Sequence, residues 1–91
     1  MSTQEAVGDV IGDINSLVDD GTLKPGQANG LNHPLDNAIR SLDKGNTADT
    51  CNQLDDFIVK VGEKTPTPLD ATTANELIAA AERIQASIDC P

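Results

Sequence analysis

Two cysteines and a single histidine are the residues of this chain best suited to chemistry. A cysteine acts as a nucleophile or redox centre when a C-x-x-C spacing or a basic neighbour favours its thiolate. Cys51 and Cys90 are far apart in sequence, and Asp49 and Asp89 beside them are acidic. A zinc site needs two further ligands, and His33 is the only histidine. The pattern favours a structural disulfide over two alternatives, which are free buried thiols and a metal or redox site.

Pairs of neighbouring carboxylates are the other residues with possible chemistry. Calcium prefers a loop with Asp or Asn at alternating positions followed by a Gly, and the chain lacks that pattern. Asp19 and Asp20 are weak metal candidates at a helix end, and Asp55 and Asp56 are interpreted as a solvated pair. The sequence therefore predicts no catalytic residue, no metal site and no cofactor, and the chain is not expected to be an enzyme.

Helical periodicity indicates the elements that position these residues. Apolar residues recur at i, i+3, i+4 and i+7 in four stretches, over about residues 3–20, 25–44, 46–63 and 70–89. Pro34 falls inside the second stretch, so a kink or break is expected near residues 30–34. Gly8 and Gly12 lie in the first stretch and are expected to allow close packing.

The four stretches predict an all-α fold, an antiparallel four-helix bundle in a single domain over residues 1–91. The string LKPGQANGL at 23–31 resembles LDATTANEL at 69–77, which indicates two related αα-hairpins. The predicted core consists of Val10, Ile14, Leu17, Leu31, Leu35, Leu54, Phe57, Ile58, Leu77 and Ile84.

The bundle topology bears on the two cysteines. The start of the third helix lies near the end of the fourth when these helices are antiparallel neighbours, so Cys51 and Cys90 are expected to meet in one disulfide. A structural disulfide in turn predicts an oxidising compartment, with the chain extracellular or at the cell surface.

Charge and hydropathy limit the partners. Six Lys and Arg stand against fifteen Asp and Glu, which gives a net charge of −9. An acidic surface without a basic cluster repels phosphate backbones and anionic lipids, so no nucleic-acid binding is expected. No apolar run is long enough to predict membrane insertion.

Three strings together carry a family resemblance: GTLKPGQANGL (21–31), LDKGNTADTCNQLDDFIVKV (42–61) and LDATTANELIAAAERI (69–84). They are similar to the FIMAH domain, a helical module of secreted bacterial and archaeal proteins, over about residues 14–90. Only Phe57-Ile58 matches the Phe-Ile-Met-Ala-His string behind the family's name, and Pro34 interrupts a helix that is normally continuous. The resemblance implies an accessory, non-catalytic module without an assigned ligand.

We therefore expect an accessory module of a larger secreted or surface protein. It would mediate protein–protein or cell-surface attachment, or act as a spacer or cap, and its partner would be a protein or a cell-surface component. The alternative is a ligand-binding module for glycan or calcium. The sequence names neither the ligand nor the oligomeric state.

Overall fold

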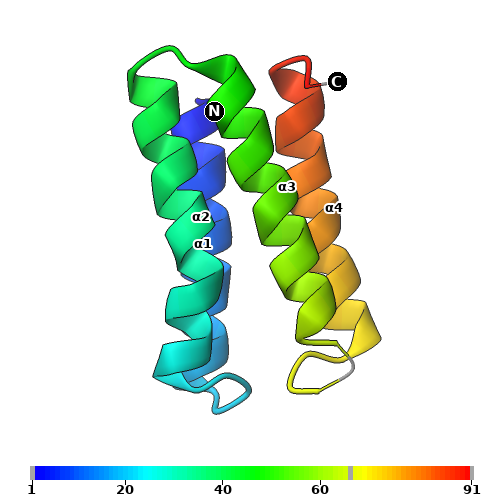
Figure 1. Ribbon diagram of the computed structural model, residues 1–91. Coiled ribbons are helices and arrows are strands. Elements are labelled where there is room, and N and C mark those ends of the chain that lie inside the picture. The colour runs from blue at the N-terminus through cyan, green and yellow to red at the C-terminus, as the bar shows by residue number, and fades with distance from the viewer. Residues whose placement is uncertain (1, 66, 91) are drawn as a thin grey trace.

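The computed structural model describes residues 2–65 and 67–90. These residues form the helices α1 (Thr3–Asp19), α2 (Pro25–Asp43), α3 (Thr47–Glu63) and α4 (Ala71–Ser87). The helices run alternately up and down, and the chain ends lie at the same end of the bundle (Figure 1). The predicted fold class, an antiparallel four-helix bundle with one disulfide, is confirmed.

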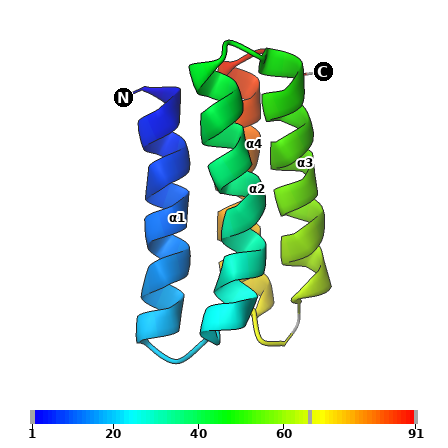
Figure 2. The ribbon, with the colours of Figure 1, turned by 60° about the vertical axis from the view of Figure 1, so that its left-hand side comes forward.

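The four helices do not contact one another equally. α2 and α3 make the most extensive contact, and α1 and α4 make the least. Within the described ranges, the diagonal pairs α1–α3 and α2–α4 do not approach each other closely. Each helix therefore packs against two neighbours around a shared core, and the weakest of the four seams joins the first helix to the last. Figure 2 shows α1, α2 and α3 side by side, with α4 behind α2.

Short polar caps and glycine turns fix the helix boundaries. Ser2, Asn46 and Asp70 precede α1, α3 and α4, and each side chain accepts a hydrogen bond from the backbone N–H three residues on, at 3.1, 3.1 and 2.7 Å. Such caps satisfy amide groups that have no partner within the helix. Gly21 and Gly45 follow α1 and α2 with φ of 85° and 72°, a conformation that glycine adopts without strain.

Pro34 does not break α2, contrary to the break considered from the sequence. The helix continues through Pro34 from Pro25 to Asp43. The proline removes one backbone hydrogen bond to the carbonyl of Gly30, and Gly30 is exposed, so water reaches this part of the helix. Leu31, Pro34 and Leu35 are all buried on one face. Their packing against the core offsets the lost bond.

The core runs the length of the bundle. Its buried hydrophobic side chains are those of Val7, Val10, Ile14, Leu23, Ala28, Leu31, Leu35, Ala38, Leu54, Phe57, Val61, Leu69, Ala74, Leu77, Ala81 and Ile84. Leu17 and Ile58, which were expected in the core, are only partly buried and pack against its edge.

Two glycines of α1 were interpreted wrongly from the sequence. A Cβ atom built on Gly8 or Gly12 would meet nothing within 4 Å, and both residues are exposed. They therefore do not serve close helix packing. Each instead lowers the intrinsic stability of α1, because glycine loses more conformational freedom on helix formation than alanine.

Candidate functional site

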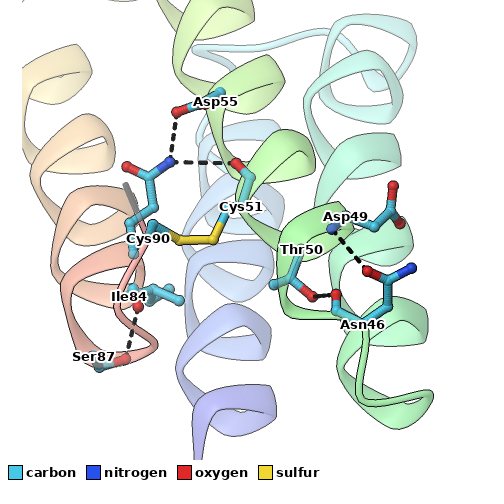
Figure 3. Close-up of a disulfide and its surroundings, with 9 residues drawn as sticks. Asn46, Asp49, Thr50, Cys51, Asp55, Ile84, Ser87 and Cys90 are labelled. Carbon is cyan, nitrogen blue, oxygen red and sulfur yellow. Dashed lines mark hydrogen bonds between the residues drawn. A yellow bond between two sulfur atoms is a disulfide. The ribbon is translucent and has the colours of Figure 1, made fainter.

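The two cysteines meet at the end of the bundle that holds the chain ends. Cys51 lies in the second turn of α3 and Cys90 follows α4, and their Cα atoms are 5.6 Å apart in a disulfide (Figure 3). Cys51 is buried with 5% exposure. Both cysteines of the chain are used in this bond, so neither offers a thiol to a substrate or a metal.

A side-chain bridge reinforces the disulfide. The Gln85 amide nitrogen on α4 donates to the Asp55 carboxylate at 2.6 Å and lies 3.5 Å from the Cys51 carbonyl oxygen. Figure 3 labels Asp55 and Cys51, and dashed lines mark both contacts. Asp55, which the sequence placed in a solvated pair, therefore joins α3 to α4. Together the covalent bond and the bridge fix the position of the last helix.

Polar side chains also hold α2 and the start of α3 in place at this end. The hydroxyl of Ser41 on α2 donates to the carboxylate of Asp49 on α3, and Ser41 is only 5% exposed. Thr50 is fully buried, and its hydroxyl donates to the Asn46 carbonyl at 2.9 Å (Figure 3). We call this set of contacts, together with the disulfide and the Gln85 bridge, the fastened end. Its polar groups are engaged with one another, which is the arrangement of a structural feature.

The weak metal candidates lie at the opposite end. Asp19 and Asp20 are exposed, and Asp20 accepts a hydrogen bond from the Thr22 backbone N–H at 2.9 Å. Hydrogen bonds from the Thr22 side chain and backbone lower the pKa of Asp20. This carboxylate therefore stabilises the turn after α1. Over residues 2–65 and 67–90, no group of three His, Cys, Asp or Glu side chains is placed to hold a metal ion.

The remaining candidate residues are surface groups. His33 is exposed on α2. Asp56 lies 4.0 Å from Lys60 in an exposed ion pair one helical turn apart, an arrangement that contributes little to stability. The structure does not bring these residues together with the cysteines or with Asp19 and Asp20 into one site.

A surface hollow that the sequence did not predict lies along the seam between α1 and α4. It has a volume of about 560 Å³. Val10 and Ile84 form its floor, and Asp9, Asp13 and Arg83 line its rim. We call it the α1–α4 groove. Hydrophobic periodicity places Val10 and Ile84 in the core, and it gives no sign of a hollow above them. The only sequence signal for this surface was the regular spacing of acidic residues on α1.

The groove continues along the seam toward the other end of the bundle. A second hollow of about 360 Å³ shares Asp13, Ala80 and Arg83 with the first. Leu77 contributes to its floor, and Glu76 adds another carboxylate to its rim. The seam thus offers an apolar floor between charged edges, which suits binding to another molecule better than chemistry within the chain.

None of the helices in the part of the chain that the structure describes is long and apolar enough to cross a membrane. The fold, the fastened end and the groove define a small disulfide-linked helical module.

The chain belongs to the FIMAH domain family, whose match covers residues 7–86. The family consists of accessory domains of larger proteins. Comparisons with the curated proteins and with the solved structures find no match. The resemblance inferred from the sequence over about residues 14–90 is thereby confirmed.

Proposed function

We propose that this chain is a non-catalytic attachment module of a larger secreted or cell-surface protein, and that it binds a protein at the cell surface. The observation that carries the proposal is the match to a family of accessory domains over residues 7–86. Nearly the whole described bundle lies within this match.

The disulfide supports the proposed location. Structural disulfides form and persist outside the cell and in other oxidising compartments, and are rare in the cytosol. The Cys51–Cys90 bond joins α3 to the segment after α4 and lies among further contacts at the fastened end. This bond supports the extracellular or surface location that is part of the proposal.

Binding to intact cells tests the function directly. Fluorescently labelled chain is incubated with washed cells of the source organism, and unlabelled chain is added as competitor. The proposal expects saturable binding that the competitor displaces and that mild proteolysis of the cells removes. Reduced and alkylated chain is the matched control, because it has the same amino-acid sequence without the Cys51–Cys90 bond.

Three outcomes would overturn the proposal. Absence of saturable binding contradicts attachment and leaves a spacer or cap. Binding that survives proteolysis but disappears after glycosidase treatment indicates a glycan ligand. Binding that is lost with a calcium chelator and restored by calcium indicates a calcium-dependent module.

A further inference from the structure

The α1–α4 groove arises from the packing of the two helices that contact each other least. Ala6 on α1 and Ala80 on α4 are partly exposed and line the groove, and their short side chains leave the seam unfilled. Val10 and Ile84 below them retain only 3% and 6% exposure. A partner side chain that enters the seam would therefore contact apolar groups at its base.

The charge along α1 is unusually one-sided. Glu5, Asp9 and Asp13 follow one another at intervals of four residues, and α1 has no Lys or Arg. Residues four apart are neighbours on a helix surface, where like charges are unfavourable. Arg83 on α4 lines the opposite rim of the groove, but the one ion pair found among residues 2–65 and 67–90 joins Lys60 to Asp56 on α3. The three carboxylates of the stripe therefore outnumber the single cation of the groove and are not paired with it. A row of carboxylates beside an apolar groove is instead complementary to a basic partner.

We infer that the α1–α4 groove docks an amphipathic helical segment of the partner protein, with apolar side chains on one edge and Lys or Arg beside them. The apolar side chains enter between Ala6 and Ala80, and the basic groups face Asp9 and Asp13. This inference rests on the proposed attachment function and assigns it a surface and a partner chemistry.

Charge also argues against two other kinds of molecule as the occupant of the α1–α4 groove. A second copy of this chain carries the same net charge of −9, and two such surfaces repel each other. A segment without positive charge would remove water from Asp9 and Asp13 without replacing it by a partner group. A basic helix repeats its side chains with the same four-residue spacing as the acidic stripe, so it pairs with consecutive carboxylates.

The probe for this surface is a synthetic peptide of about 14 residues, roughly four helical turns, with Leu on one face and Lys beside it. It is titrated into the isotopically labelled, oxidised chain while amide chemical shifts are followed. We expect saturable shifts that cluster on the groove-lining residues of α1 and α4 and weaken with added salt. A Lys/Ser peptide of equal charge, which lacks the apolar edge, is expected to bind about tenfold more weakly.

Matched variants separate the groove from the general acidity of the chain. Asp9→Asn with Asp13→Asn removes two groove charges and is expected to weaken peptide binding about fivefold. Asp36→Asn with Glu63→Gln removes two exposed charges elsewhere and is expected to leave the affinity within about twofold. Ala80→Leu fills the groove without altering charge and is also expected to weaken binding about fivefold. Circular dichroism and the thermal midpoint verify that each variant is folded.

Two results would overturn the inference. One is that the shifts spread over all acidic surfaces, with equal loss of affinity in both charge-removal variants. The other is that Ala80→Leu binds the peptide as tightly as the parent chain. The same variants in the cell-binding assay distinguish the two proposals. Unchanged cell binding by the groove variants rejects the groove and retains attachment, whereas absence of cell binding by the parent chain rejects attachment itself.

Discussion

The α2–α3 side of the bundle and the α1–α4 seam are built from the same kind of amphipathic helix, yet they pack differently. α2 and α3 share the most extensive contact, and Ser41 is hydrogen-bonded to Asp49 across it. The α1–α4 seam has the least contact and contains the groove above Val10 and Ile84. One side therefore holds the fold together, and the other leaves open the groove that we propose as a docking surface.

Intrinsic helix preference does not explain this difference. α2 contains Gly26, Gly30 and Pro34, which are poor helix formers, and it is still continuous. α4 is rich in alanine, the best helix former, and it makes less contact with its neighbours than α2 does. Tertiary packing decides which helices are held firmly, because most helical stability in proteins comes from the buried face.

Loss of the disulfide has the largest expected effect. Closing a loop with a sequence separation of 39 residues stabilises the folded state by about 4 kcal/mol in the chain-entropy model. In urea unfolding, the Cys51→Ser/Cys90→Ser variant is expected to lose most of this free energy of unfolding. If the variant and the oxidised parent unfold at the same urea concentration, the fastened end does not stabilise the fold.

A matched pair of leucine truncations compares the two sides directly. Leu54 on α3 is fully buried, whereas Leu17 on α1 is partly exposed beside the groove. Leu54→Ala is expected to lower the free energy of unfolding by about 3 kcal/mol, and Leu17→Ala by about 1 kcal/mol, because less apolar area is lost. Equal losses in urea unfolding would mean that the α1–α4 seam is packed as well as the rest.

Stabilising substitutions in α1 have a smaller effect. The structure leaves open space around Gly8 and Gly12, so alanine fits at either position. Gly8→Ala and Gly12→Ala are each expected to raise the free energy of unfolding by about 0.5–1 kcal/mol. A fall in the thermal midpoint of either variant would indicate a contact at these positions and contradict the exposed face of α1.

The smallest effect concerns acid. Asp20 and Asp70 lie at the end of α1 and the start of α4, and hydrogen bonds from Thr22 and Thr73 lower the pKa of each below the ordinary value of 3.8. A carboxyl with a lowered pKa stabilises the folded state above its unfolded pKa and loses that contribution as the pH falls through its folded pKa.

The acid prediction is tested by thermal midpoints between about pH 7 and pH 3. The parent chain is expected to lose stability more steeply below about pH 5 than the Asp20→Asn/Asp70→Asn variant, since asparagine accepts the same hydrogen bonds without titrating. Parallel profiles for the two proteins would show that these caps do not contribute to the acid response.

The helices and the cysteine pairing could be predicted from the sequence. The helices follow from the spacing of the apolar residues, and the pairing follows from the antiparallel order of the third and fourth helices. The apolar stripe placed Leu54 and Phe57 in the core, where both are fully buried. Leu23 and Leu69 were not included in the predicted core, although they are buried, because they lie in connections where helical periodicity does not apply. Their equivalent positions in the two repeated strings were the available signal.

The groove could not be predicted from a single helix. Its presence depends on the separation of α1 and α4 and on Ala6 and Ala80 lying along the seam. Hydrophobic periodicity shows which face of a helix points toward the core, but it does not show how far apart two helices lie. Of the kink or break expected near Pro34, the break does not occur, because the burial of Leu31 and Leu35 on either side holds α2 together.

Native-state hydrogen exchange measures most directly whether the α2–α3 side and the α1–α4 seam differ in local stability. Amides in the middle of α2 and α3, near Leu35 and Leu54, are expected to exchange slowest in the oxidised chain. Those in the middle of α1 and α4 are expected to exchange at least about tenfold faster, because these helices have fewer packed contacts to break before opening. Protection in α1 equal to that in α3 would contradict this account of the bundle.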